Sequence, residues 1–444
     1  MLKTFPAGGV HPPENKITAN APIQYLPVPE NVIIPVSQHI GAPATPVINK
    51  GDYVKTGQLI AAAKGYVSSN IHSSVSGKVN KIDNAPDSSG YKQPSVFIDV
   101  EGDAWTDTID RNPEIIQEVV LTSEEIIKKC VESGIVGLGG ATFPSHVKLT
   151  IPSGSKCEVL IINGVECEPY LTSDHRLMLE RGEEVLIGTT ILMKALKVKS
   201  AMIGIESNKP DAISHMSKLA TDFKGITVHG LKVKYPQGAE KQLIKALINR
   251  EVPTGRLPLD VGTVVHNVGT AFAVYEAVQK NKPLFERVVT ITGKSLKHPG
   301  NFFVRTGTPL SSLIDAAGGL PEDTGKIVAG GPMMGKAINT TDVPVVKGMS
   351  GVVLIPLTES ARIKINPCIR CGKCVSVCPL NLEPYLLMAL TEKNLVERAE
   401  KERITDCMEC GSCSFICPAG RPLLDYIRLG KSIILKMIRE RNLK

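Results

Sequence analysis

Long apolar segments are missing from this sequence of 444 residues. A helix that spans a bilayer needs about 20 predominantly apolar residues. The best candidates, residues 185–193 and 261–275, are too short or contain polar side chains such as His266. The first 14 residues also lack the apolar core of a signal peptide. These absences argue against an integral membrane protein and predict a cytoplasmic chain.

Aromatic residues are also scarce, with nine Phe, nine Tyr and one Trp, so aliphatic side chains must fill most of the interior. Hydrophobic residues make up 42% and charged residues 21%, which excludes a disordered or coiled-coil chain. The length is typical of about three domains. Most of the net charge of +7 lies in residues 421–444, and a nucleic-acid-binding protein would more usually carry a basic face on its main fold. We therefore expect no nucleic-acid partner.

Turn residues and hydrophobic periodicity predict five consecutive parts. Residues 1–120 join a proline-rich arm, expected to wrap over another domain, to short strands that resemble a biotinyl/lipoyl-type barrel-sandwich. Residues 121–286 alternate helices and strands, which favours an α/β layer fold with a largely parallel sheet. Residues 287–360 resemble a β-grasp module of the SLBB type. Residues 361–420 hold most cysteines, and residues 421–444 are predicted to form a helix. In the α/β part we expect helices at residues 124–133, 183–196, 239–249 and 271–279, and strands at residues 157–162 and 200–205.

Cysteine is abundant, and eight of the eleven cysteines form two runs of the pattern C-x-x-C-x-x-C-x-x-x-C-P. Thiolates are soft ligands that suit iron–sulfur clusters, and in two-cluster ferredoxins the fourth cysteine of each run binds the other cluster. The alternative is zinc, whose sites usually take two C-x-x-C pairs. We predict one 4Fe–4S cluster on Cys368, Cys371, Cys374 and Cys417, and another on Cys407, Cys410, Cys413 and Cys378.

Four other segments carry residues suited to a nucleotide ligand. A glycine-rich loop at residues 134–144 would let backbone amides approach a phosphate, and Lys148 follows it; a tight turn is an equally good explanation. Asn163, Glu166 and Glu168 follow a predicted strand, where α/β folds bind ligands, although they could form a polar turn. The last two segments are residues 235–243, which open a helix, and residues 266–270.

In this order and spacing, the four segments resemble the flavin- and NADH-binding subunit of respiratory complex I and its relatives. The family's G-R-G-G-A-G-F-P loop matches residues 137–144, with Leu138 in place of arginine and Thr142 in place of glycine. Its N-x-D-E-x-E-P, Y-x-x-G-E-E and N-N-V-E-T motifs match residues 163–169, 235–240 and 266–270. Three acidic residues of these motifs are replaced by Val165, Ala239 and Gly269.

The chain as a whole resembles the RnfC (RsxC) family of the Rnf electron transport complexes, through residues 8–16, the barrel-sandwich, the diverged flavin motifs, residues 330–335 and the two-cluster tail. This resemblance implies a multidomain α/β protein: a Rossmann-like FMN/NADH-binding domain with an N-terminal barrel-sandwich hybrid, an SLBB module and a two-cluster ferredoxin-like helical domain. It implies noncovalent FMN, two 4Fe–4S clusters and NADH as the substrate. The residues expected to bind FMN or NADH are Gly137, Gly139, Gly140, Phe143, Lys148, Asn163, Glu166, Glu168, Gly238, Glu240, Asn267 and Thr270.

The resemblance also implies a function. Glu168 would help to position the nicotinamide-ribose end of NADH, and Lys148 would neutralise flavin or nucleotide charge. The chain would be an NADH-dependent oxidoreductase component of an ion-translocating complex, bound peripherally at the cytoplasmic side of the membrane. Its partners would be RnfB, RnfD and RnfG and the membrane-embedded RnfA and RnfE, and the complex would exchange electrons with ferredoxin.

Two alternatives remain at this point. One is the diaphorase subunit of a soluble hydrogenase or formate dehydrogenase, and the other is a non-catalytic iron–sulfur relay that has lost its flavin. The C-terminal segment raises a separate question, because its apolar residues recur at helical spacing opposite basic ones. This apolar stripe could pack on the cluster domain, or it could bind an anionic membrane surface or a partner. The stripe consists of Leu423, Tyr426, Ile427, Ile433, Ile434, Met437 and Ile438.

Overall fold

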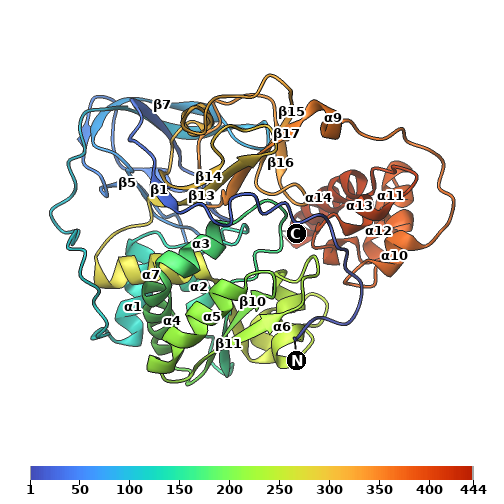
Figure 1. The fold of residues 1–444 in the computed structure, drawn as a ribbon, viewed down its shortest axis with the longest axis horizontal. Coiled ribbons are helices and arrows are strands. Elements are labelled where there is room, and N and C mark those ends of the chain that lie inside the picture. The colour runs from blue at the N-terminus through green and yellow to red at the C-terminus, as the bar shows by residue number, and fades with distance from the viewer. Residues whose placement is uncertain (1, 443–444) are drawn as a thin grey trace.

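The computed structural model describes residues 2–442 of the chain, which fold into a barrel-sandwich, an α/β unit, a β-grasp unit and a helical cysteine-rich unit (Figure 1). The barrel-sandwich and the β-grasp unit lie side by side above the α/β unit, and the cysteine-rich unit lies at one end. Among the described residues, no helix is both long enough and apolar enough to cross a membrane.

The barrel-sandwich consists of two small antiparallel sheets packed face to face. Its core is aliphatic, and along β7 buried Gly77 and Val79 alternate with exposed Lys78 and Asn80, as expected for a strand with one face inside. One sheet has the order β2 (Asn31–Pro35), β8 (Lys92–Val100), β7 (Gly77–Pro86) and β4 (Tyr53–Val54). The other has the order β3 (Thr45–Pro46), β5 (Leu59–Ala62) and β6 (Ile71–His72).

The α/β unit is built on a fully parallel sheet with the order β11 (Ile226–Leu231), β10 (Ala201–Glu206), β9 (Val159–Asn163) and β12 (Thr263–Asn267). Because the chain moves outward from β9 to β11 and then returns to place β12 on the other side of β9, the order reverses between β9 and β12. Ligands bind at such a reversal, beyond the carboxyl ends of the strands.

Helices cover both faces of this sheet, because its strands present apolar side chains on both sides. Leu160 and Ile162 pack with one group of helices, while Ile161 and Val265 pack with α6 on the opposite face. The first group is α1 (Ser123–Glu132), α4 (Gly182–Leu196), α5 (Pro210–Leu219) and α7 (Val268–Gln279). α2 (Ser145–Leu149) and α3 (Ser173–Glu180) also contribute side chains to this first group, and α6 (Glu240–Ile248) covers the opposite face; short 3-10 helices lie at Ala220–Asp222 and Pro258–Val261.

The β-grasp unit is a six-stranded sheet whose edge strand comes from the N-terminal arm. The order is β1 (Ile23–Tyr25), β14 (Gly300–Arg305), β13 (Glu286–Gly293), β17 (Gly351–Pro356), β15 (Thr324–Ala329) and β16 (Lys336–Ile338), with α8 (Leu310–Ala316) packed on it and α9 (Leu357–Ser360) after it. Before reaching this sheet, the arm pairs with β11 at Lys3 and with Tyr235 at Val10. The arm therefore wraps over another domain, as the prolines predict.

The cysteine-rich unit is helical, with α10 (Lys373–Ser376) and α13 (Ser412–Ile416) each placed inside one cysteine run. The remaining elements are α11 (Pro384–Glu392), α12 (Val396–Lys401), a 3-10 helix at Ile404–Asp406 and α14 (Leu423–Asn442). Ile427 and Ile434 of α14 are buried against Leu387, Leu390 and Ile404.

This packing accounts for part of the C-terminal stripe. Leu423, Ile427 and Ile434 form the core of the cysteine-rich unit, and only Ile433 of the stripe is exposed. The expectation that the stripe binds a membrane or a partner is therefore wrong for these three buried residues, and it stays a prediction for Tyr426, Ile433, Met437 and Ile438. The predicted fold class is confirmed, while the predicted domain boundaries stay predictions.

Candidate functional site

The reversal of strand order brings two predicted site residues together. Asn163 ends β9, Asn267 ends β12, and the two are directly paired in the parallel register. The side-chain amide of Asn267 donates to the carbonyl oxygen of Asn163 at 3.3 Å, and that of Asn163 donates to the carbonyl oxygen of Gly238 at 2.8 Å. Residues 163, 238 and 267 thus meet at the carboxyl edge of the sheet.

The glycine loop lies directly on this edge. The amide of Leu138 donates to the hydroxyl of Thr270 at 2.9 Å, and a side chain built at Gly139 would lie 3.4 Å from the β-carbon of Asn267. Gly140 has a φ of +112° and open space beyond its α-carbon, while the amide of Gly137 closes the loop by donating to Phe143 at 2.9 Å. Exposed backbone without side chains is what the approach of a phosphate or flavin requires.

Lys148 and Glu240 form an ion pair beside the loop. The ammonium lies 2.8 Å from the carboxylate and donates to the carbonyl oxygen of Val265 at 3.1 Å. Lys148 comes from α2, directly after the glycine loop, and Glu240 begins α6, so the pair bridges the two sides of the edge. Both side chains are about one-third exposed, which leaves the ammonium accessible to an anionic ligand.

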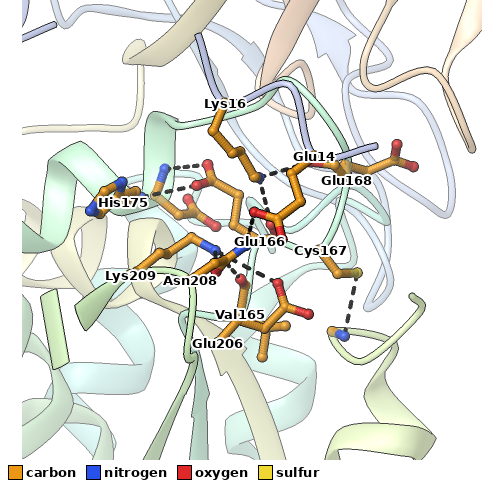
Figure 2. Close-up of polar contacts among 12 residues, drawn as sticks. Glu14, Lys16, Val165, Glu166, Cys167, Glu168, His175, Glu206, Asn208 and Lys209 are labelled. Atoms are coloured by element: carbon orange, nitrogen blue, oxygen red, sulfur yellow. Dashed lines mark hydrogen bonds and ion pairs between the residues drawn. The ribbon is translucent and has the colours of Figure 1, made fainter. Parts of the chain in front are cut away.

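Glu166 caps the start of α3. Its backbone has a φ of +48°, and its carboxylate accepts from the amides of Asp174 at 2.7 Å and His175 at 3.2 Å (Figure 2). A carboxylate in this position accepts hydrogen bonds from free amides at the start of α3, and its negative charge interacts favourably with the positive end of the helix dipole. The predicted FMN or NADH contact of Glu166 stays a prediction, and the structure gives this side chain a capping role.

Glu168 is also held by protein groups. Its carboxylate accepts from the amides of Met333 at 3.1 Å and Met334 at 2.8 Å, and from the hydroxyl of Tyr235 at 3.4 Å. Burial raises the pKa of Glu168 to about 7, although these donors and Lys16 act against the rise. The carboxylate therefore joins the α/β unit to residues 330–335 of the β-grasp unit, and its contact with the nicotinamide ribose stays a prediction.

Two lysines, the partly buried Lys16 and the buried Lys209, fix the segment that carries these acids (Figure 2). Lys16 donates to the carbonyl oxygens of Glu166 and Glu168, both at 2.9 Å, and burial lowers its pKa to about 8. Lys209 donates to the carbonyl oxygen of Val165 at 2.8 Å and pairs with Glu206. Sequence reasoning singled out residues 8–16 only as part of a resemblance, and nothing in the local pattern marks Lys209.

A further buried cation supports the loop from behind. Arg287 of β13 donates to the carbonyl oxygens of Leu138 at 3.3 Å and Lys347 at 2.6 Å, and it lines a cavity with Asp174. The carboxylate of Asp174 accepts from Asn267 at 2.6 Å, and burial raises its pKa. Sequence reasoning missed Arg287 and Asp174, because their positions become meaningful only when the β-grasp sheet packs on the α/β unit.

The second cysteine run forms one pocket with the last cysteine of the first run. Cys378, Cys407, Cys410 and Cys413 line a cavity whose walls are otherwise mostly apolar, including Leu382, Leu387 and Ile427. Burial raises the thiol pKa values of Cys407 to about 11 and Cys413 to about 12, so the thiolates need a bound cation. Within residues 2–442, no three Cys, His, Asp or Glu side chains converge as a single metal ion would require. Thiols spread around a cavity suit a four-iron cube better than one zinc ion.

The other cysteines lie nearer the surface. Cys374 and Cys417 pack against the same apolar group, which contains Met388 and Leu423, while Cys368 and Cys371 are exposed. The structure therefore groups Cys417 with the first run and Cys378 with the second, which is the arrangement that crossed ligation needs. The complete ligand sets stay predictions.

The buried cysteine pocket adjoins the candidate flavin edge. The hydroxyl of Tyr235 donates to the carbonyl oxygen of Cys410 at 2.8 Å, and the side-chain amide of Gln242 in α6 donates to Pro379 at 3.1 Å. Tyr235 belongs to the same motif as Gly238 and Glu240. A nucleotide-binding edge and a cysteine pocket joined in this way suit the transfer of electrons between two bound groups.

Family models match four consecutive regions of the chain. They are described as an RnfC barrel-sandwich hybrid domain at residues 3–103, a Nuo51 FMN-binding domain at residues 130–276, an SLBB domain at residues 288–337 and a 4Fe-4S dicluster domain at residues 360–418. These matches follow the order of the units in the structure.

Similar proteins are matched along nearly their whole length. The chain is 49% identical to the C component of the proton-translocating ferredoxin:NAD(+) oxidoreductase complex of Clostridium ljungdahlii, over 97% of this chain and 94% of that protein. It is 46% identical to the C component of the Na(+)-translocating complex of Acetobacterium woodii, over 98% of both chains. It is 43% identical to the C component of the ion-translocating oxidoreductase complex of Rhodobacter capsulatus, over 96% of this chain and 82% of that protein.

Among solved structures, an NAD+-reducing [NiFe]-hydrogenase in the H2-reduced state has a chain of similar fold. The TM-score is 0.51 at 18% identity, over 70% of this chain and 62% of the hydrogenase chain. At this identity the likeness concerns the fold alone.

Proposed function

This chain belongs to the RnfC family of ion-translocating ferredoxin:NAD(+) oxidoreductase complexes, and we propose that it is the component at which the complex exchanges electrons with NADH. It is an oxidoreductase subunit of a multi-subunit complex, and it holds FMN and two 4Fe–4S clusters. Bound FMN would supply the conversion between the two-electron hydride of NADH and the single electrons that 4Fe–4S clusters carry. The residues of this chain must therefore hold the flavin, orient NADH against it and bring a cluster close to it.

The glycine loop and the edge residues would hold the flavin. Gly139 and Gly140 leave room for a ligand to approach the backbone, and their amides can donate to its phosphate. Lys148 would balance the phosphate charge, with Glu240 keeping its ammonium in place. Gly137, Phe143, Asn163, Gly238, Asn267 and Thr270 would shape the walls of this site.

Glu166 and Glu168 would hold the protein segments around the site in position. Glu166 fixes the start of α3, and Glu168 fixes residues 333–334 and the hydroxyl of Tyr235. We propose that Glu168 affects NADH binding mainly by holding residues 333–334 and Tyr235 in position. Glu168 would also contact the nicotinamide ribose directly.

The single observation that carries the function is the hydrogen bond from Tyr235 to Cys410. This hydrogen bond supports the proposal, because it links the second cysteine pocket to the motif that contains Gly238 and Glu240, residues that would hold the flavin. Cys410 and Cys413 of this pocket are buried, whereas Cys368 and Cys371 of the first run are exposed, which supports a path for electrons from the flavin through the buried cluster to the surface cluster.

The wider role follows from the family. We propose that the chain sits peripherally on the cytoplasmic side of the membrane and contacts RnfB, RnfD and RnfG and the membrane-embedded RnfA and RnfE. The complex as a whole would couple electron exchange between ferredoxin and NAD to ion translocation, and this chain would supply the NADH end.

A flavin-loading experiment tests the proposal. The chain is reconstituted anaerobically with FMN, iron and sulfide, and NADH-dependent dye reduction is measured. Gly139→Val should evict FMN while secondary structure and iron content remain, because Gly139 is exposed and a β-carbon there would make only an ordinary 3.4 Å contact with Asn267. Gly139→Ala, which adds only a methyl group, is the matched milder variant. Stoichiometric FMN in Gly139→Val, or wild-type protein that binds FMN but never oxidises NADH, would refute the assignment.

A further inference from the structure

The two cysteine runs differ in what surrounds them, although their spacing is the same. The second run has three acidic residues within residues 402–409, and one of them, Glu409, pairs inward with Arg428 at 3.2 Å and Lys431 at 3.1 Å. The first run overlaps residues 361–373, a segment that has four cations and no acid. One run is turned toward the flavin edge, and the other is turned toward solvent.

Residues 361–373 form an exposed surface loop, which we call the basic loop. Every residue of it is exposed, including Cys368 and Cys371. Its cations are Arg362, Lys364, Arg370 and Lys373, and among the described residues only Arg362 of these has an acidic partner, Asp425 at 2.7 Å.

Apolar side chains stand between these cations. Ile363, Ile365 and Ile369 are 62%, 53% and 67% exposed, and Tyr385 beside them is 43% exposed. The loop is nevertheless fixed in place, because the amide of Asn366 donates to the carbonyl oxygen of Ala419 at 2.9 Å and Ile363 packs against Gly420. Isoleucines held in solvent by an ordered backbone are a common feature of surfaces that bind a protein.

We propose that the basic loop is the docking surface for an acidic one-electron carrier domain of another subunit of the same complex. This inference rests on the proposed function, because it names the partner of the surface cluster. Charge complementarity identifies the partner's chemistry: a face rich in Asp and Glu would be steered toward the four cations, and its apolar centre would cover the isoleucines. The small size of the patch suits a transient encounter, as electron-transfer contacts usually are.

The other possible use of the cations is local. A cluster held by four thiolates is itself anionic, so nearby cations could serve only to balance its charge. A soluble carrier with an acidic face is the remaining alternative occupant. These explanations differ in which protein lies against Lys364 and Lys373, and in whether salt modulates the effect of charge reversal.

Carbodiimide crosslinking of the intact, membrane-bound complex tests which protein contacts the basic loop. This reagent joins lysine ammonium groups to carboxylates in contact. Lys364 and Lys373 should be joined to Asp or Glu of a redox-active subunit, and the product should disappear in the Lys364→Gln/Lys373→Gln variant. Products confined to this chain, or formed only with an added acidic ferredoxin, would overturn the proposal.

Charge reversal in the complex tests the function of the loop. Lys364→Glu/Arg370→Glu/Lys373→Glu should slow electron transfer from NADH to the neighbouring subunit at least tenfold at low salt, with a smaller difference at high salt. NADH-dependent dye reduction should be unchanged. The control, Lys50→Glu/Lys92→Glu/Lys224→Glu, makes the same charge change at exposed sites elsewhere and should have little effect.

Because two of these residues adjoin cysteines, Lys364→Glu/Ile365→Asp serves as a second variant with iron content measured first. An equal effect of the control, or a shift in cluster potential large enough to explain the slower rate, would overturn the proposal. Failure of the proposed function would be seen separately, as an absence of NADH-dependent dye reduction in the wild-type chain.

Discussion

The hydroxyl of Tyr235 donates a 2.8 Å hydrogen bond to the carbonyl oxygen of Cys410. Tyr235 is almost fully buried, and its hydroxyl also lies 3.4 Å from the carboxylate of Glu168. Tyr235 belongs to the motif that opens α6, and its side chain contacts both the segment after β9 and the second cysteine run. This contact joins the nucleotide-binding half of the molecule to its iron–sulfur half.

Tyr235→Phe should weaken this junction without emptying either site. The buried carbonyl of Cys410 loses its donor, which costs about 1–3 kcal/mol of stability. FMN and iron should remain, and stopped-flow absorbance should show slower reduction of the clusters after NADH is added. Tyr91→Phe, which alters an exposed tyrosine of the barrel-sandwich, is the control. Cluster reduction at the wild-type rate would show that the contact has no part in electron transfer.

Crossed ligation predicts which cluster each cysteine controls. Cys378→Ser should damage the cluster of the second run, and Cys417→Ser that of the first, with iron falling from about eight to about four per chain in each case. Electron paramagnetic resonance of the remaining cluster distinguishes the two variants. If Cys378→Ser gave the same spectrum as Cys374→Ser, ligation would be confined within each run. Cys157→Ala changes a cysteine outside the runs and should keep both clusters.

Lys148→Met should reduce FMN affinity about tenfold, equivalent to about 1.4 kcal/mol. The substitution removes the cation beside the glycine loop and leaves the carboxylate of Glu240 to repel the phosphate. Fluorescence titration of the flavin-free chain with FMN measures the change. Lys156→Met removes an exposed charge from a nearby loop and should not alter the affinity.

Lys347 should make stability depend on pH. Its side chain is 1% exposed, its ammonium donates to the carbonyl oxygens of Asn70 and Gly134, and burial lowers its pKa to about 7. The unfolded chain keeps this proton up to about pH 10. Between these values the unfolded state binds more protons, so this group makes stability rise with pH.

Denaturant unfolding at pH 7 and pH 9 checks this dependence. The stability of the wild type relative to Lys347→Met should increase over this interval by up to about 2–3 kcal/mol. Lys50→Met, at an exposed site, should show no such change relative to the wild type. An identical pH dependence in the wild type and in Lys347→Met would mean that the buried ammonium keeps its ordinary pKa.

Ile434→Ala should destabilise the cysteine-rich unit by about 2–5 kcal/mol, because it opens a cavity between α14 and α11. Leu435→Ala, at the next and partly exposed position, should cost far less. Deletion of the residues after Gly430 removes Ile434 and should therefore cause loss of iron. Retention of both clusters in the truncated chain would show that α14 is dispensable for this core.

The sequence by itself determined the features that depend on short separations along the chain. Eight cysteines at fixed spacing indicate two clusters, since three thiols only a few residues apart can reach one ligand. Hydrophobic periodicity placed α4, α6 and α14 within a few residues of their observed bounds. The glycine loop, Asn163 and Asn267 were found as local motifs, and the parallel order of β9 and β12 then brought them together.

Only the tertiary structure decided where the charged side chains of the site point. Glu166 and Glu168 lie in one motif, yet the carboxylate of Glu166 binds the nearby start of α3, whereas that of Glu168 binds the amides of residues 333–334, which are adjacent to it only after folding. Lys16, Arg287 and Lys347 each contact backbone more than 100 residues away. The helical stripe of α14 was visible in the sequence, but which surface covers it depends on long-range packing that periodicity does not encode.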